Sequence, residues 1–87
     1  VTHSTTKYMD GHAMALGGCI VDSGNFDWEA HKEKFPGLTT PDESYHGVIY
    51  TQKFGKKAYI TKATAQLMRD MGACQSPQNA FLTNVGL

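Results

Sequence analysis

The stretch LGGCIVD, residues 16–22, carries the strongest fold signal in the chain. Its apolar residues do not alternate with polar ones, which is typical of a strand that is buried on both faces. The β-branched residues Ile20 and Val21 favour a strand over a helix. We therefore predict one short strand at about residues 16–22, within the sheet of an α/β protein.

Two helices are predicted after this strand, at about residues 55–71 and 77–85. In the first helix, apolar residues recur at helical spacing and should pack in the core: Ile60, Ala63, Leu67, Met68 and Met71. Gly72 stands where a helix C-terminus is commonly capped. Ser76 and Pro77 are typical of the N-cap and first turn of the second helix.

Residues 23–50 form a long connection without a clear periodic pattern. Aromatic residues are scattered along it: Phe26, Trp28, Phe35, Tyr45 and Tyr50. A loop of this length in a compact domain usually serves a function or packs on another surface. We expect these side chains mainly to pack, with a substrate entrance or a subunit interface as the alternatives. A short helix near residues 28–34 is compatible with the sequence.

One strand and two helices cannot close an α/β sheet. We therefore expect the 87-residue chain to be truncated at both ends. This expectation rests on the pattern of elements alone.

Charge and composition exclude several classes of partner. Eight basic and eight acidic residues give zero formal net charge, whereas nucleic-acid binders need a basic surface. The longest apolar run, residues 13–21, is far shorter than the roughly 20 residues that cross a bilayer. Cys19 and Cys74 are too few and too far apart for a disulfide scaffold, which favours free thiols and a cytoplasmic protein. We expect neither a nucleic-acid partner nor a membrane.

No metal site is predicted. The histidine and cysteine residues match no zinc-binding spacing: His3, His12, Cys19, His31, His46 and Cys74.

The segment HSTTKY, residues 3–8, is the best candidate for chemistry. A lysine that forms a Schiff base with a phosphorylated cofactor needs hydroxyl or backbone N–H groups nearby to hold the phosphate. If the segment is extended, Ser4 and Thr6 face one way and Lys7 faces the other. On the residues alone, a surface loop with a solvated lysine is the commoner explanation.

The same segment, followed by Gly11-His12 and Gly17-Gly18, resembles the cysteine and methionine metabolism family of pyridoxal-phosphate enzymes. These enzymes have the aspartate-aminotransferase-like fold (fold type I). The resemblance covers the whole chain, and further stretches are similar to its O-acetylhomoserine sulfhydrylase branch: residues 21–28, 35–36, 41–47, 58–62, 69–73 and 76–82. Ala13 and Gln78 depart from the family pattern, but neither lies in the core motif.

The resemblance implies that residues 1–87 are part of the pyridoxal-phosphate-binding large domain, with the cofactor lysine in segment 1–12. It implies that Lys7 forms the internal aldimine and moves protons, and that Ser4 and Thr6 bind the cofactor phosphate. The family residues that contact the ring and the substrate carboxylate have no counterpart here. A neighbouring subunit is expected to complete the phosphate site, in a homotetramer.

The activity implied is that of a transferase of methionine biosynthesis. It would convert O-acetylhomoserine and sulfide, or a thiol, to homocysteine, or a related product, and acetate by γ-replacement. A methionine γ-lyase or a cystathionine γ-synthase or lyase is the nearest alternative, and the insert between Asp22 and Tyr50 argues against it. A catalytically inert fragment is the alternative of another class, since the isolated piece is expected to be inactive.

Overall fold

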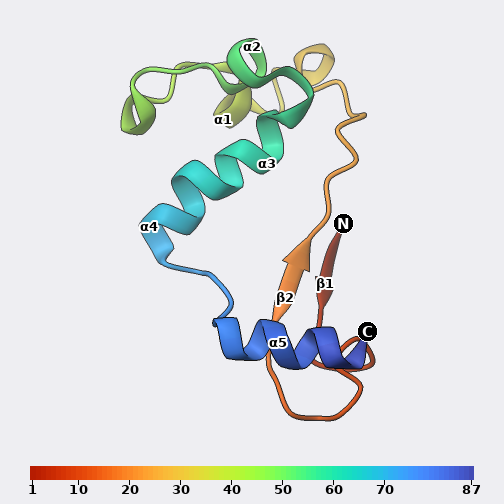
Figure 1. Ribbon diagram of the computed structural model, residues 1–87. Helices are drawn as coiled ribbons and strands as arrows, with labels where there is room; N and C mark the ends of the chain where they lie inside the picture. Colours follow the sequence, from red (N-terminus) through yellow and green to blue (C-terminus); the bar gives the residue numbers. More distant parts are fainter. The chain divides into compact units, whose positions relative to one another are not determined.

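The computed structural model describes all 87 residues, which form two compact units (Figure 1). Unit 1 contains residues Val1–Val21 and Cys74–Leu87, and unit 2 contains Asp22–Ala73. Unit 1 combines two separate segments of the chain, whereas unit 2 is one continuous segment, and the candidate lysine belongs to unit 1.

Unit 1 is built on a two-stranded antiparallel sheet of β1 (Thr2–Ser4) and β2 (Gly18–Ile20). The helix α5 (Pro77–Gly86) belongs to the same unit. As the sequence predicted, the Ser76 side chain caps this helix by accepting a hydrogen bond from the Asn79 amide. The Asn79 side-chain amide also donates to the Leu16 carbonyl at 3.1 Å, so the first turn of α5 is attached to the residues that lead into β2.

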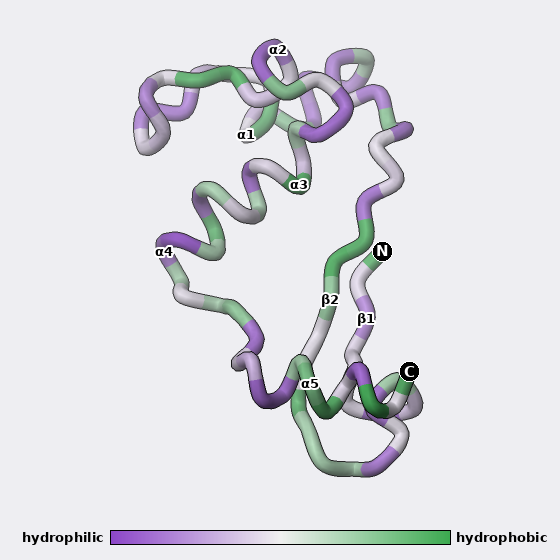
Figure 2. The backbone as a smooth tube through the Cα atoms, viewed as in Figure 1, coloured by the Kyte–Doolittle hydropathy of each residue, from purple (hydrophilic) through white to green (hydrophobic).

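The prediction of a single buried strand is wrong. The structure has two strands, because residues 2–4, where no strand was predicted, pair with β2 in the register Thr2 with Ile20 and Ser4 with Gly18. Within this chain β2 has only β1 as a hydrogen-bonded neighbour, and Ile20 is 45 % exposed. Burial on both faces would need elements that these 87 residues do not supply. Figure 2 shows the hydrophobic stretches along β2 and α5.

Unit 2 is a set of short helical segments around a small core. Their bounds are η1 (Glu29–His31), α1 (Pro36–Thr39), η2 (Glu43–Tyr45), α2 (Tyr50–Phe54), η3 (Gly55–Lys57), α3 (Ala58–Lys62), η4 (Ala63–Met68) and α4 (Arg69–Met71). The core contains Leu38, Tyr50 and Ala58, and partly buried aromatic residues pack around it: Trp28, Tyr45, Phe54 and Tyr59. The region predicted as one long loop at 23–50 therefore contains three short helical turns, which pack on the following helices.

The helix predicted at about 55–71 differs in its start and in its interior. Gly55 has a positive φ of 54° and is followed by the 3-10 turn η3, so regular α-helix starts at Ala58. Residues 63–68 then form a π-helix. The wider π turn changes the angle between successive side chains. The apolar residues therefore do not all reach the core, and Leu67 and Met71 are 50 % and 75 % exposed.

Gly72 ends α4 in the left-handed conformation, with φ 67°, as the sequence predicted. Its amide donates to the Met68 carbonyl at 2.8 Å. Glycine adopts this conformation without a steric penalty from a side chain, which makes it a favourable residue at a helix C-terminus.

Candidate functional site

Lys7 lies in a tight turn that directly follows β1. The Asp10 amide donates to the Thr5 carbonyl at 2.9 Å, and the Gly11 amide donates to the Lys7 carbonyl at 2.9 Å. The Thr5 amide donates to the Gly17 carbonyl at 2.9 Å, which attaches the start of the turn to the residues leading into β2. The backbone that carries Lys7 is therefore fixed at both ends of the turn.

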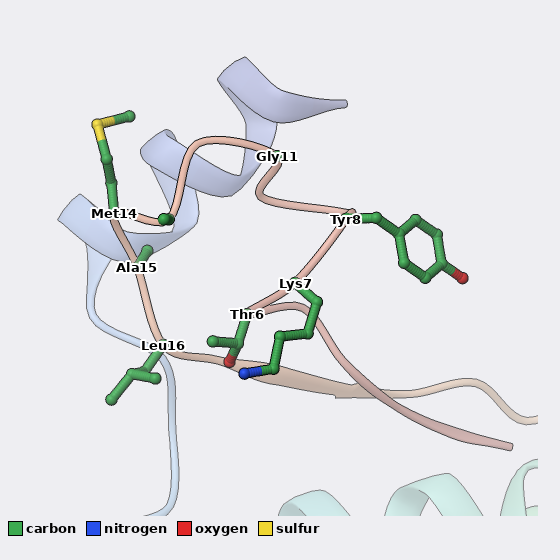
Figure 3. Close-up of a pocket in the computed structure, with 8 residues that line it drawn as sticks. Thr6, Lys7, Tyr8, Gly11, Met14, Ala15 and Leu16 are labelled. Carbon is green, nitrogen blue, oxygen red and sulfur yellow. The ribbon is translucent and has the colours of Figure 1, made fainter.

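The side chain of Lys7 borders an open hollow of about 610 Å³ in unit 1. Its walls come from the turn and from the loop that follows: Thr6, Lys7, Tyr8, Gly11, Ala13, Met14, Ala15 and Leu16. The volume lies within the roughly 300–1,000 Å³ that is typical of small-molecule sites. Figure 3 shows the Lys7 and Thr6 side chains extending in the same direction, while the Tyr8 ring points away. The Lys7 side chain is exposed, so a ligand in the hollow can reach its amine.

The two predicted phosphate-binding hydroxyls lie in different surroundings. The Thr6 hydroxyl lines the hollow, accepts a hydrogen bond from the Gly17 amide at 3.2 Å and lies 3.4 Å from the Gly17 carbonyl oxygen. The Ser4 hydroxyl, in β1, is exposed and accepts from the Thr6 amide at 3.3 Å. Ser4 is not among the residues that line the hollow.

The prediction that Ser4 and Thr6 face one way and Lys7 the other is wrong. The alternation of side chains holds only in an extended strand, and here the strand ends at Ser4. The chain then turns, so Thr6 and Lys7 both border the same hollow. The turn thus brings the Lys7 amine and the Thr6 hydroxyl together. The alternation of side chains along a strand could not predict this arrangement.

Two buried polar residues of the turn were missed by sequence reasoning. Thr5 is 5 % exposed, and its hydroxyl has no hydrogen-bond partner. Asp10 is completely buried, and its Oδ2 accepts from the Met14 amide at 2.9 Å and the His12 amide at 3.3 Å. The Met14 bond contributes most to holding the pKa of the Asp10 carboxyl below its ordinary value. The Asp-Gly pair at 10–11 is a turn signal that could have identified Asp10.

A polar cluster in unit 2 brings the partly buried side chains of Asp42 and Lys62 next to the buried Tyr50. The Ser44 hydroxyl donates to Asp42 Oδ1 at 2.7 Å, and this bond is the main cause of the lowered pKa of Asp42. Lys62 Nζ lies 3.9 Å from Asp42 Oδ2 but donates to the Gly37 carbonyl at 2.7 Å. Burial, and then the nearby Asp42, raise the pKa of Tyr50 to about 12. Tyr50 is therefore a neutral phenol at neutral pH and serves as a core side chain.

The aromatic residues of segment 23–50 mainly pack, as predicted. The Trp28 ring stacks on Tyr59 with centroids 5.5 Å apart and meets Phe35 edge-on at 4.9 Å. Phe26 also packs, with its ring centroid 4.6 Å from that of Trp28, but it is 49 % exposed and borders a second hollow of about 360 Å³ within unit 2. The alternative that Phe26 faces a ligand or another surface therefore stays open as a prediction.

Other features of the chain can be stated briefly. No group of three or more His, Cys, Asp and Glu side chains is arranged to hold a metal ion. None of the helices has the length and apolar composition required to cross a membrane. Both cysteines are free thiols, with Cys19 half-buried in β2 and Cys74 exposed.

Comparison with known proteins identifies the family. The sequence model of the Cys/Met metabolism PLP-dependent enzymes matches residues 1–87. The chain belongs to this family. Over its whole length it is 48 % identical to a sulfhydrylase of Fusarium oxysporum f. sp. lycopersici and 46 % identical to the homocysteine/cysteine synthase of Saccharomyces cerevisiae. It is 42 % identical to O-acetyl-L-homoserine sulfhydrylase 1 of Thermus thermophilus. The chain spans 20 % of the length of each of these relatives.

Family membership makes pyridoxal phosphate the expected cofactor, and the residues of unit 1 fit it. The cofactor carries an aldehyde and a phosphate, which call for a primary amine and for hydrogen-bond donors. The hollow provides both, because the exposed Lys7 amine and the Thr6 hydroxyl border it together. The two strands and the helices form a small α/β piece, as predicted.

Proposed function

We propose that this chain is part of the large, cofactor-binding domain of a fold type I pyridoxal-phosphate transferase, cytoplasmic and homotetrameric, that acts on an acylated homoserine. The observation that carries the proposal is the position of Lys7. Its exposed amine borders a hollow of about 610 Å³ together with a hydroxyl, in a chain that matches the family along all of its residues.

Lys7 would hold the cofactor through its Nζ. A primary amine condenses with an aldehyde, and the same amine, once released and unprotonated, takes up and returns protons as a general base and acid. Bound pyridoxal phosphate supplies an electron sink that stabilises negative charge on the substrate carbon next to it. The turn from Thr5 to Gly11 fixes the Lys7 backbone, so the flexible part is the side chain, which can swing between holding the cofactor and moving a proton.

Thr6 and Ser4 would hold the phosphate. The Thr6 hydroxyl borders the hollow beside Lys7. The Ser4 oxygen accepts a hydrogen bond from the Thr6 amide, which leaves its O–H free to donate. Hydrogen bonds from hydroxyls to a phosphate are charge-assisted and about twice as strong as neutral ones. A neighbouring subunit would supply further phosphate contacts, so that the sites are shared between subunits.

The reaction we propose is γ-replacement. The bond from the γ-carbon of O-acetylhomoserine to the acetate oxygen breaks, and a bond from that carbon to the sulfur of sulfide or a thiol forms. The products are acetate and homocysteine or a related thioether. Relatives named sulfhydrylase and homocysteine synthase support this choice over a lyase acting on methionine or cystathionine.

The test uses the full-length protein loaded with pyridoxal phosphate. Borohydride reduction followed by peptide mapping should find the cofactor on Lys7, and Lys7→Ala should show no label. Lys62 is the matched control, because its amine already donates to the Gly37 carbonyl, and Lys62→Ala should keep the label. Label on any lysine other than Lys7 would refute the assignment. Homocysteine formed from O-acetylhomoserine and sulfide tests the reaction separately.

A further inference from the structure

We propose that Asp10 is a positioning residue of the cofactor site. Its buried carboxylate holds residues 11–14 in the conformation that forms part of the wall of the Lys7 hollow. This inference rests on the proposed role of Lys7, and it assigns to Asp10 a function that does not require contact with the cofactor.

The carboxylate binds the loop through one of its two oxygens, while Oδ1 is buried without a hydrogen-bond partner. Asp10 is 0 % exposed, and its Oδ2 accepts both the His12 amide at 3.3 Å and the Met14 amide at 2.9 Å. The Asp10 carbonyl oxygen also lies 3.0 Å from Nδ1 of His12. An ionised carboxylate is a stronger acceptor than a carbonyl, so these bonds hold the loop more firmly than ordinary turn bonds would.

The conformation of Ala13, which lies between the two bonded amides of His12 and Met14, explains why the loop needs the Asp10 carboxylate. Ala13 has a positive φ of 55°, a left-handed conformation that is costly for a residue with a side chain. Such a conformation persists only where the surroundings enforce it. The carboxylate binds the amides on both sides of Ala13, and Ala13 and Met14 border the hollow. Loss of the carboxylate should let the loop relax and change the shape of that wall.

The position of Asp10 itself is fixed by its backbone. Its amide closes the Lys7 turn by donating to the Thr5 carbonyl at 2.9 Å. On its other side, the backbone is packed against α5 so closely that a Cβ on Gly86 would overlap the Asp10 carbonyl. One residue thus connects the turn that carries Lys7 with the loop that shapes the hollow, and both would shift together if it moved.

The experiment measures the loop and the cofactor independently in the full-length protein. Amide hydrogen exchange reports residues 11–16, and titration of the apoprotein with pyridoxal phosphate gives the Kd from the cofactor absorbance. In Asp10→Ala, exchange at His12 and Met14 and the cofactor Kd should each rise at least about tenfold, because two charge-assisted bonds are lost. Asp10→Asn keeps an acceptor oxygen and should restore both values to within about threefold of wild type.

Asp22→Ala is the matched control, because Asp22 accepts a comparable bond from the Gly24 amide at 3.1 Å outside the hollow. It should leave both readouts unchanged. If Asp10→Ala does not fold, Asp10→Ser gives a milder comparison. A serine hydroxyl can reach the amide two residues further on but not the one at Met14, so exchange should rise at Met14 alone, with a smaller rise in Kd.

Two results would overturn the role of Asp10. One is unchanged exchange at His12 and Met14 in Asp10→Ala. The other is faster exchange with an unchanged Kd, which would make Asp10 a purely structural residue. Failure of the proposed function has a different signature, since borohydride would then label a lysine other than Lys7 in the wild-type protein.

Discussion

The hydroxyl of Thr6 accepts a hydrogen bond from the Gly17 amide at 3.2 Å and lies 3.4 Å from the Gly17 carbonyl oxygen. This contact joins the turn that carries Lys7 to the residues that lead into β2, across 11 positions of sequence. A hydroxyl has one proton to donate and can accept two hydrogen bonds. Thr6 can therefore keep its bond from the Gly17 amide while its proton turns toward a ligand in the hollow.

This geometry predicts a stronger effect for Thr6 than for Ser4. Thr6→Ala loses both the Gly17 contact and a phosphate donor, and should weaken cofactor affinity about ten- to a hundredfold, since a bond to a charged group is worth about 1.5–3 kcal/mol. Thr6→Ser keeps the hydroxyl and should stay within about threefold of wild type. Titration of the apoprotein measures both. If the double variant Ser4→Ala, Thr6→Ala retains the cofactor as well as the wild type does, neither residue binds the phosphate.

We expect the phenol of Tyr50 to ionise at higher pH than an ordinary tyrosine when the folded protein is titrated with alkali. Burial and the nearby Asp42 raise the pKa of Tyr50 to about 12, so the folded protein keeps a proton that the unfolded chain loses near pH 10. Stability from the neutral phenol is therefore complete below about pH 10 and is lost as the pH rises toward about 12. Ultraviolet difference titration of wild type against Tyr50→Phe in the full-length protein should isolate this one late phenol.

The control for this titration is Tyr59→Phe. Tyr59 stacks on Trp28 at the edge of the core and is partly buried, whereas Tyr50 is completely buried. The late step should persist in Tyr59→Phe. Its persistence in Tyr50→Phe as well would assign the late phenol to another residue.

Local chemistry accounts for the parts of the fold that the sequence predicted. Gly72 and Ser76 act at helix ends through their own backbone and side chain, so the residue type alone indicates their role. Pairing of β1 with β2 is different, since it depends on partners about 16 residues apart, and residues 2–4 carry no strand pattern of their own. The π-helix at residues 63–68 is likewise invisible to a periodicity based on the α-helix.

The candidate site shows the same division. The residue types of the segment at 3–8 identified Lys7 and Thr6, which the structure brings to one hollow. The turn that brings them together is closed by hydrogen bonds from the backbone amides of Asp10 and Gly11. The predicted side-chain directions were wrong because they hold only for an extended segment. Asp10 was missed because its importance comes from complete burial and from two backbone amides, and neither is visible in a list of residue types.

The isolated 87-residue chain should not melt cooperatively. Its buried apolar side chains are few, namely Ala15, Leu38, Tyr50 and Ala58. Many large apolar residues are exposed: Val1, Tyr8, Met14, Leu16, Ile20, Val21, Phe26, Leu67, Met68, Met71, Phe81, Val85 and Leu87. Small chains with little buried apolar area do not offset the entropy of folding. Calorimetry and circular dichroism should show a broad unfolding transition, and an activity assay should show no turnover. A sharp melt of a monomer would contradict this expectation.

The full-length enzyme should make homocysteine and little 2-oxobutyrate. Loss of acetate leaves an unsaturated amino acid, to which sulfide adds at the γ-carbon to give homocysteine. If water instead hydrolyses the carbon–nitrogen bond at its α-carbon, the products are 2-oxobutyrate and ammonia. A site closed to bulk water suppresses this loss. We expect the aromatic segment between Phe26 and Tyr50 to take part in the closure, directly or by packing a neighbouring subunit against the site.

Phe26 is the residue through which to test this closure. Removing Trp28 or shortening the segment would disturb the core of unit 2, because Trp28 packs against that core and stacks on Tyr59. The Phe26 ring contacts Trp28 but is not among the residues packed against the core. Phe26 is 49 % exposed and borders the hollow of about 360 Å³. Phe26→Ala should therefore raise the fraction of 2-oxobutyrate at least about threefold, which corresponds to a loss of roughly 0.7 kcal/mol in discrimination between the two products. The cofactor content should stay the same. Met71→Ala, at a residue 75 % exposed at the end of α4, should change neither quantity. Product analysis of O-acetylhomoserine with sulfide measures the ratio. Equal ratios in Phe26→Ala and wild type would remove the segment from the closure, and methanethiol with 2-oxobutyrate made mainly from methionine would show that the enzyme is a lyase.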